Sequence, residues 1–197
     1  MTDPAQSTRR RTVRYIAIFL VTAGISTALD LVSKWWVFQE MGAKVVDGQA
    51  VHEDGSLPGD EIHTDISKTF FQIRLRVNRG AVWGILRNKP ELLLALSIFA
   101  IGFIVYMLIR SKERDAPLPV SLGLICGGAL GNLWDRQFHD GVRDFLHVFW
   151  KDPIAMAWPT FNLADVFICI GVGLYLFLEI FSGKEEDEKA KKEPAKA

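Results

Sequence analysis

Residues 92–109 read LLLALSIFAIGFIVYMLI, a run of eighteen positions without one charged side chain. Three further charge-free stretches lie at 15–29, 116–134 and 166–178. All 23 Lys and Arg and all 23 Asp and Glu residues of the 197-residue chain fall outside the four stretches. A helix needs about 20 residues to cross the ~30 Å hydrocarbon core of a bilayer. The pattern therefore excludes an ordinary soluble domain and predicts a membrane protein. The net charge of zero gives no reason to expect a nucleic-acid partner.

Extending each stretch to membrane length predicts four transmembrane helices. We expect these spans at about 15–38, 91–110, 116–135 and 162–181. The first extension brings Asp30 and Lys34 into a helix, and the fourth brings in Asp165. The basic and apolar N-terminus also has the form of a cleaved signal peptide, but apolar residues continue past Asp30 and no persuasive small-x-small cleavage site follows. We therefore expect an uncleaved first span.

Positive charge in the short flanks predicts how these helices are oriented. Arginines precede the first span, and three basic residues occupy the short link at 110–114. Because Lys and Arg are enriched on the cytoplasmic side, we expect both termini inside and the loops 39–90 and 136–161 outside. Residues 1–181 then form one membrane domain, and the charged tail 182–197 is expected to be disordered.

The outer segments contain further local patterns. Residues 42–65 are rich in Gly, Asp and His and predict an exposed excursion. Residues 69–77 (TFFQIRLRV) alternate apolar residues with Arg74 and Arg76, which predicts an amphipathic strand. Four aromatic residues flank the membrane boundary and predict an interfacial belt. They are Trp134, Phe149, Trp150 and Trp158.

The cysteines and histidines give no sign of a metal site. Cys126 and Cys169 fall in apolar spans without a CxxC pattern, and the four His residues show no ligand spacing. We expect the two cysteines to be small buried residues rather than a disulfide or a metal pair.

Polar residues collect near one end of the predicted helices. With the orientation above, five groups approach the outer face of the membrane. They are Asp30 with Lys34, residues 78–81, residues 127–136, residues 141–145, and Asn162 with Asp165. Polar groups inside a membrane are costly and mostly serve function, so we expect the functional site at this outer face.

Several of these residues also have purely structural explanations. Asp30 and Lys34 are four residues apart and could form an ion pair within one helix. The small residues at 127–131 (GGALG) suit close helix packing. Asn162 at the N-cap with Asp165 at the third helical position would form a variant of the capping box.

Asp144 has no such explanation. It lies in the strand-like run 142–146 (VRDFL), and taken alone it could pair with a neighbouring arginine, Arg143 or Arg136. Together with Asp165 it gives two carboxylates on elements joined by a 20-residue connection. Two carboxylates in contact share one proton, so one can act as general base on water while the other polarises a carbonyl. Amide hydrolysis by paired aspartates is thus one interpretation, beside the structural one.

Five motifs occur in an order that resembles the lipoprotein signal peptidases (type II signal peptidases) of bacteria. They are DLVSK at 30–34, NRGAVWG at 78–84, GGALGNLWDR at 127–136, GVRDF at 141–145 and FNLAD at 161–165. Any one of these motifs is weak, but five in this order are specific. The resemblance covers about residues 15–181, apart from the excursion at 42–65.

The resemblance implies a membrane all-α bundle of four transmembrane helices with a small extracytoplasmic β-cradle. It implies an aspartyl endopeptidase that removes the signal peptide of a diacylglyceryl-modified prolipoprotein by cleaving just before the lipidated cysteine. Asp144 and Asp165 match the catalytic aspartates. The positions expected to bind or position the substrate or the aspartates are Asn132, Arg136, Asn162, Asn78 and Gly80. Those expected to be mainly structural are Asp30, Lys34 and Asp135.

The resemblance also bears on location and partners. It implies a multi-pass protein of the bacterial cytoplasmic (inner) membrane, with the active site at the extracytoplasmic face and no metal or cofactor. The partners expected are the prolipoprotein substrate and membrane lipids, without nucleic acid, and we expect a monomer. Two departures are visible: Val166 follows Asp165 where a small hydroxyl residue is common, and the first outer loop is longer than usual.

Two other classes of function are compatible with the residues. A small transporter would use Asp30, Asp144 and Asp165 as proton or cation sites. It would be expected to carry carboxylates along the whole membrane depth, and four helices without an inverted repeat suit alternating access poorly. A non-catalytic lipid- or peptide-binding protein would keep the groove without the chemistry, and it would survive loss of one carboxylate.

Overall fold

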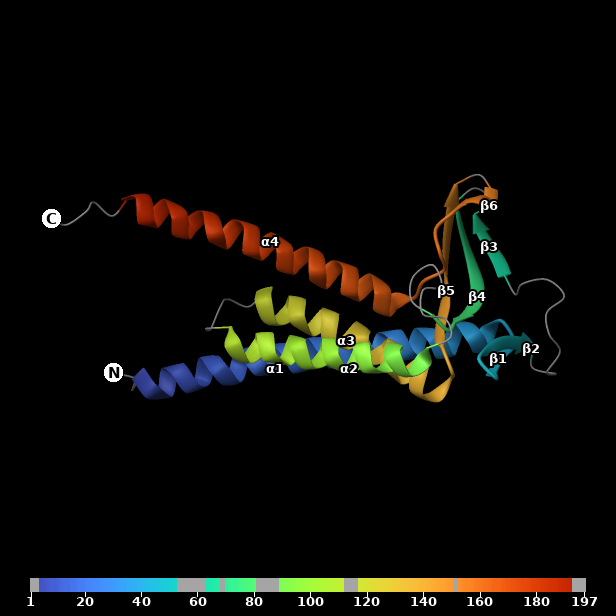
Figure 1. The fold of residues 1–197 in the computed structure, drawn as a ribbon, viewed down its shortest axis with the longest axis horizontal. Helices are drawn as coiled ribbons and strands as arrows, with labels where there is room; N and C mark the ends of the chain where they lie inside the picture. Colours follow the sequence, from blue (N-terminus) through green and yellow to red (C-terminus); the bar gives the residue numbers. More distant parts are fainter. Residues whose placement is uncertain are drawn as a thin grey trace.

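Four long helices dominate the structure, a computed structural model that describes residues 4–52, 63–67, 70–80, 89–111, 117–150 and 152–192. The helices are α1 (Pro4–Glu40), α2 (Pro90–Arg110), α3 (Pro117–Phe138) and α4 (Leu163–Lys192). Each contains a stretch long and apolar enough to cross a membrane, which confirms the four expected helices. The beginning of α1 and the end of α4 lie at one end of the molecule, and the described strands lie at the other (Figure 1).

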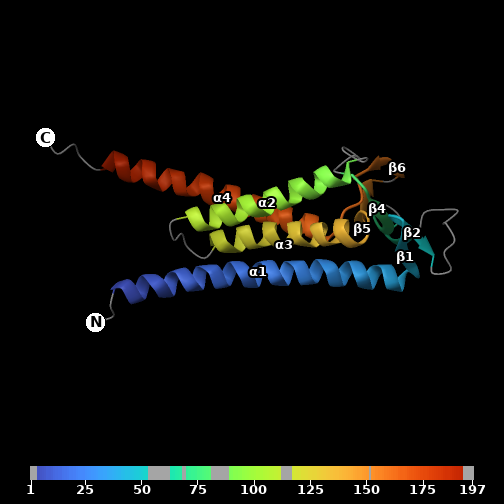
Figure 2. The same cartoon turned by 60° about the horizontal axis from the view of Figure 1, so that its bottom comes forward.

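The third helix is central, because it packs against α1, α2 and α4. In Figure 2, α3 lies between α1 and the other two helices. A Cβ at Gly127 would clash with Ser26 on α1, and a Cβ at Gly128 would clash with the carbonyl of Ala164 on α4. The packing role expected for residues 127–131 is therefore confirmed. An apolar cluster joins α1, α2 and α3 in the half that lies away from the strands. Its buried members are Tyr15, Phe19, Ala23, Ile104, Leu108, Leu118, Leu122 and Cys126.

Two antiparallel sheets lie at the other end of the helices. β1 (Ala43–Val46) and β2 (Gln49–His52) form a hairpin. Its turn holds Asp47 and Gly48 at φ angles of 48° and 65°, the positive values that a two-residue Asp-Gly turn supplies. The second sheet has the strand order β3-β4-β5-β6. Its strands are β3 (His63–Ser67), β4 (Phe71–Asn78), β5 (Val142–Trp150) and β6 (Asp152–Ala157).

The strand predicted at 69–77 is confirmed as β4, but its alternation is interrupted. A bulge lies between Ile73 and Arg76, which pair with Leu146 and Asp144 of β5. Paired residues on adjacent strands point to the same face of a sheet. The bulge therefore brings Arg76 onto the face that carries Asp144. Periodicity alone could not reveal this shift, because it depends on the partner strand.

A second apolar cluster fastens the sheets to α1. Its buried members are Val37, Phe38, Ala43, Leu75 and Phe145, from α1, the hairpin, β4 and β5. The Arg143 guanidinium also lies over the Phe38 ring, 6.0 Å from its centroid. The cluster thereby fixes β5 relative to the helices.

Three expectations from the sequence are corrected by the structure. α4 continues to Lys192, into the tail that was expected to be disordered; the Glu, Lys and Ala residues there favour helix and repeat at i,i+4 spacing. Cys169 is exposed, whereas Cys126 is buried as expected. Phe149 is buried and stacks on His147, because it lies on the covered face of β5, so it does not belong to an exposed aromatic belt.

The other aromatic residues of the predicted belt, Trp134, Trp150 and Trp158, are exposed. Residues 53–62 of the predicted excursion, residue 69 of the predicted strand and residues 81–84 of the second motif lie outside the described residues.

Candidate active site

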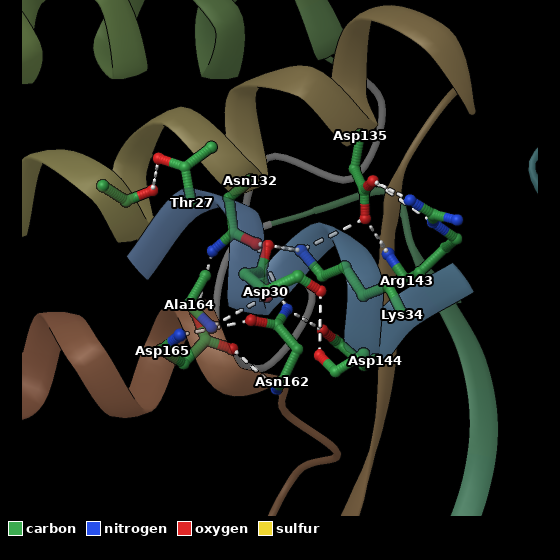
Figure 3. Close-up of polar contacts among 12 residues, drawn as sticks. Thr27, Asp30, Lys34, Asn132, Asp135, Arg143, Asp144, Asn162, Ala164 and Asp165 are labelled. Atoms are coloured by element: carbon green, nitrogen blue, oxygen red, sulfur yellow. Dashed lines mark hydrogen bonds and ion pairs between the residues drawn. The ribbon is translucent and has the colours of Figure 1, made fainter. Parts of the chain in front are cut away.

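Four aspartates gather where the helices meet the sheet (Figure 3). Asp30, Asp135, Asp144 and Asp165 come from α1, α3, β5 and α4. The first three are at most 2% exposed, and Asp165 is partly exposed. Buried carboxylates need hydrogen-bond or charge partners, and the partners found here define the site.

Asn162 and Asp165 form a capping box at the start of α4. The backbone N–H of Asp165 donates to Oδ1 of Asn162, and the backbone N–H of Asn162 donates to Oδ2 of Asp165, both over 3.2 Å. The structural explanation of these residues is therefore confirmed, since they satisfy N–H groups that a first helical turn leaves unpaired. The same box fixes the Asp165 carboxylate, so capping and a role in chemistry are compatible.

The side-chain amide of Asn162 also reaches Asp144. Its Nδ2 donates to Oδ1 of Asp144 over 2.7 Å and to Oδ1 of Asn132 over 3.2 Å. Nδ2 of Asn132 in turn donates to Oδ1 of Asp165 over 3.0 Å. The two asparagines thus hold Asp144 and Asp165 in one hydrogen-bonded group.

Asp144 is the more deeply buried of the two candidate catalytic aspartates. Burial raises its pKa to about 8, and the negative charge of Asp165 adds to the rise. The hydrogen bonds from Asn162 and Asn78 and the charge of Lys34 oppose it. The raised pKa favours the protonated form of Asp144 at neutral pH. Both oxygens of Asp165 accept N–H hydrogen bonds, as those of a carboxylate do.

Lys34 is a fully buried ammonium group with three oxygen partners. Its Nζ donates to Oδ2 of Asp30 over 2.6 Å and to Oδ1 of Asn132 over 3.0 Å, and it lies 3.2 Å from Oδ2 of Asp135. The ion pair predicted within α1 is confirmed, and it also extends to α3. Because Lys34 holds the amide oxygen of Asn132, the amide nitrogen is directed toward Asp165.

The second carboxylate oxygen of Asp30 caps α4. Oδ1 accepts the backbone N–H of Ala164, the residue before Asp165, over 2.9 Å. Gly131 of α3 lies so close that a Cβ there would clash with the Asp30 carboxylate. Glycine at 131 therefore leaves the room in which a carboxylate from α1 reaches the start of α4.

Asp135 ties α3 to β5 through Arg143. It accepts the backbone N–H of Arg143 over 2.9 Å. It also accepts from the Arg143 guanidinium, over 2.7 Å from Nη2 and 3.2 Å from Nε. Arg143 thus pairs with Asp135 rather than with Asp144, and the residue immediately before Asp144 is held by three hydrogen bonds.

The candidate catalytic aspartates line a pocket of about 470 Å³. The polar residues Asn78, Asn132 and Arg136 and the glycine Gly80 line it with them, whereas Asn162 is not among the lining residues. The remaining lining residues are Leu93, Leu96, Ser97, Ala100, Ala129, Val142, Trp158, Pro159, Thr160, Phe161, Ile168 and Cys169. The pocket therefore joins an apolar wall from α2 and α4 to a polar end at the sheet.

Arg136 and Asn78 contribute hydrogen-bonding groups to the polar end. Nη1 of Arg136 donates to the carbonyl of Asn132 over 3.1 Å, and its buried Nε has no hydrogen-bond partner within the described part of the chain. Oδ1 of Asn78 accepts the backbone N–H of Gly80 over 3.0 Å. Arg136 thus lines the pocket while its buried Nε has no partner among the described residues.

Sequence reasoning did not identify α2 or the segment before Phe161 as parts of the site. Ser97 of α2 and Trp158 and Thr160 line the pocket. The only signal available for Ser97 was its hydroxyl group in a span that is apolar apart from Ser97 and Tyr106. Their inclusion depends on which elements meet in space, and the sequence pattern does not contain that information.

Comparison with known proteins places this arrangement in a family. Residues 18–181 match the family model for signal peptidase (SPase) II. The chain belongs to the signal peptidase II family. The match covers four helices of membrane-spanning length and all five motifs. Membership of the signal peptidase II family identifies a membrane peptidase and supports a lipoprotein signal peptidase function.

Two solved structures resemble this signal peptidase II family member. The first is a bacterial membrane enzyme determined by the in meso method at 2.3 Å resolution. It is 25% identical, with 92% of this chain and 95% of that chain covered and a TM-score of 0.67. The second, also a bacterial membrane enzyme, was determined by the same method at 1.9 Å resolution. It is 27% identical, with 82% of this chain and 92% of that chain covered and a TM-score of 0.62. These similarities fit a multi-pass bacterial membrane protein.

Proposed function

We propose that this chain is an aspartyl endopeptidase that removes the signal peptide from diacylglyceryl-modified prolipoproteins, cleaving just before the lipidated cysteine. The observation that carries the proposal is the placement of Asp144 and Asp165 on one pocket wall, with Asn162 hydrogen-bonded to both. A protonated and an ionised carboxyl group side by side are what water-mediated amide hydrolysis requires.

In the proposed mechanism Asp165 is the general base and Asp144 the general acid. Asp165 takes a proton from a water molecule, whose oxygen bonds to the carbonyl carbon of the scissile amide while Asp144 protonates the carbonyl oxygen. The tetrahedral diol then collapses. Asp165 gives its proton to the leaving nitrogen as the C–N bond breaks, and Asp144 recovers a proton from a diol hydroxyl. The signal peptide leaves with a new carboxyl terminus, the cysteine leaves with a free amine, and both aspartates regain their starting states.

The pocket suits a substrate that is itself anchored in the membrane. Leu93 and Leu96 of α2 and Ile168 of α4 form an apolar wall, and we place the signal helix against it. Asp165 is the third residue of α4, so the aspartates lie within about one turn, roughly 5 Å, of the helix start. A diacylglyceryl group with its chains in the bilayer would hold the substrate cysteine near this depth.

The proposed orientation has both termini in the cytoplasm and the pocket at the extracytoplasmic face of the inner membrane. It is supported by the basic flanks at 9–14 and 110–114. The beginning of α1 and the end of α4 also lie at the end of the molecule opposite the sheets. We propose that one chain is sufficient for the reaction.

The surrounding polar residues have positioning roles in this proposal. Arg136 lines the pocket, and we assign its guanidinium to a carbonyl oxygen of the substrate backbone. Asn78 and Gly80 line the polar end together with Arg136. We assign them to the same extended segment of the substrate backbone. Asp30, Lys34 and Asp135 hold the catalytic aspartates through Ala164, Asn132 and Arg143.

The direct test uses purified protein in lipid vesicles with one prolipoprotein in two forms, with and without its diacylglyceryl group. We expect cleavage of the lipidated form alone, with the lipidated cysteine as the new N-terminus by mass spectrometry. Equal rates on both forms would contradict the role of the lipid anchor. A vesicle preparation of Asp144→Asn serves as the matched control, and undiminished cleavage by that variant would contradict the aspartyl mechanism.

The same preparations test the two alternative functions. A binding protein would retain the lipidated precursor without cleaving it, in the wild type as well as in Asp144→Asn. A transporter would move protons or cations across the vesicle membrane, and Asp144→Asn or Asp165→Asn would abolish that flux. Binding of the precursor without cleavage, or ion flux without cleavage, would contradict the peptidase function and support the corresponding alternative.

A further inference from the structure

Arg76 is a charged residue that the proposed mechanism does not use. Its side chain is exposed, and it makes no hydrogen bond or ion pair within the described part of the chain. Burial and the positive charge of Arg76 both lower the pKa of Arg74. Two guanidinium groups therefore lie near each other on β4, and an anion bound there would relieve their repulsion.

The β4 bulge puts Arg76 beside the candidate catalytic site. Arg76 pairs with Asp144 in the β4–β5 register, so the two side chains share a face, with Cα atoms about 5 Å apart. Asn78, two residues further along β4, lines the pocket and lies on the same face at a spacing of about 7 Å. Arg76 therefore lies one step beyond the pocket along the sheet.

A substrate chain that leaves the pocket between Asn78 and Asp144 passes this part of the sheet. If the signal helix lies against the apolar wall of α2 and α4, the residues after the cysteine leave on the opposite, polar side. That side is bounded by Asn78 and Asp144. An extended chain advances about 3.3 Å per residue, so the second or third residue after the scissile bond comes within reach of the Arg76 side chain.

We propose that Arg76 forms a subsite for an acidic side chain at the second or third residue after the scissile bond. This inference rests on the proposed peptidase function. A guanidinium presents planar donors that match a carboxylate. Among the described residues no carboxylate forms an ion pair with the Arg76 guanidinium, including Asp144, its cross-strand neighbour. The site faces the pocket rim rather than a lipid-facing helix, which favours the substrate over a phospholipid headgroup as the source of the anion.

The test compares lipidated precursors that differ only in carrying Asp, Asn or Lys at the second and third positions after the scissile bond. For the wild type we expect kcat/KM for the Asp form to exceed that for the Asn form by about 1.4-fold to fivefold, the range of an exposed ion pair. The preference should shrink as salt is raised toward 1 M. In Arg76→Gln the Asp and Asn forms should be cleaved at equal rates, and Arg76→Glu should prefer the Lys form.

Lys44→Gln is the matched control, since it removes one exposed positive charge from the hairpin while leaving Arg76 in place. It should keep the wild-type preference. A wild type without preference, or Arg76→Gln with an unchanged preference, would overturn the subsite. Weaker binding of Arg76→Gln to vesicles that contain anionic phospholipid, with the preference intact, would assign Arg76 to lipid instead. Because every comparison uses cleavage of the Asn form as its baseline, failure of the subsite is distinguishable from failure of the peptidase function.

Discussion

One residue, Asn162, links the helix cap to the candidate chemistry. Its Oδ1 accepts the Asp165 backbone N–H, while its Nδ2 donates to Asp144. The capping and catalytic interpretations of Asp165 therefore cannot be separated by geometry. They can be separated by measurement, because a cap affects stability and a general base affects rate.

Replacing either aspartate by Asn should abolish cleavage with little loss of structure. We expect Asp144→Asn and Asp165→Asn each to lose nearly all activity, and the double variant to lose little more, because residues that act as a unit are not additive. Asp165→Asn should also lose up to about 1 kcal/mol of stability through its weakened cap. Cleavage rates and melting temperatures of the three variants check this. If Asp165→Asn remained active but were less stable, Asp165 would act only as a helix cap, and the proposed catalytic pair would be excluded.

The protonation of Asp144 predicts how activity depends on pH. The proposed active form carries a proton on Asp144, whose pKa is raised to about 8. We therefore expect kcat/KM to fall as pH rises through about 8, approaching tenfold per unit above it. Initial rates on the lipidated precursor over this range provide the measurement, and a flat profile up to about pH 10 would contradict the assignment of Asp144 as the acid.

Stability should change with pH in a related way. The folded-state pKa of Asp144 lies above the ordinary value of 3.8, so between these two values the folded protein holds a proton that the unfolded chain has lost. The contribution of Asp144 to stability therefore decreases as pH rises from about 4 to about 8 and is constant above that range. Asp144→Asn should flatten this component of the melting temperature profile in detergent. The same slope in wild type and variant would show that Asp144 is not its source.

Arg136 should act through geometry rather than charge alone. Its Nη1 donates to the carbonyl of Asn132, while its buried Nε has no partner among the described residues. Arg136→Lys keeps the charge and loses the planar fork, so we expect a folded protein with turnover reduced about tenfold to a hundredfold, the loss of one or two oriented hydrogen bonds. If Arg136→Lys showed wild-type kinetics and an unchanged melting temperature, Arg136 would have no role in positioning the substrate.

At the scale of elements, the close contact of α1 with α3 controls where α4 begins. A Cβ at position 131 would clash with the Asp30 carboxylate that caps α4 at Ala164. We expect Gly131→Ala to displace Asp30, disorder the start of α4 and lower activity at least tenfold. The reason is that small displacements of catalytic groups cost this much or more.

Gly173→Ala is the matched control on α4, because nothing lies within 4 Å of a Cβ there. It should retain activity and gain a few tenths to about 1 kcal/mol of helix stability. Cleavage rates and melting temperatures of the two variants in the same detergent make the comparison. Equal activity in both would show that the Asp30 contact does not position the site.

Across the whole molecule, the sequence could predict what depends on local pattern. Charge-free length predicted the four helices, the i,i+4 spacing predicted the pair of Asp30 and Lys34, and the order of motifs brought out Asp144 and Asp165. The features that it could not predict depend on tertiary contacts between elements that are far apart in the sequence. The pairing of Asp135 with Arg143 requires α3 and β5 to adjoin, and the placement of Arg76 requires a bulge defined by a partner strand.

The ion pair within α1 has a consequence for how the protein is assembled. An isolated charge in a helix entering the bilayer is costly, but Asp30 and Lys34 neutralise each other on one helix and before any other helix is present. α1 can therefore enter the lipid first, and Asn132 and the Ala164 N–H can replace lipid contacts when α3 and α4 arrive. Lys34→Met would leave Asp30 uncompensated during insertion. Its first defect should therefore be a reduced amount of membrane-integrated protein during synthesis, before any folded site exists to be impaired.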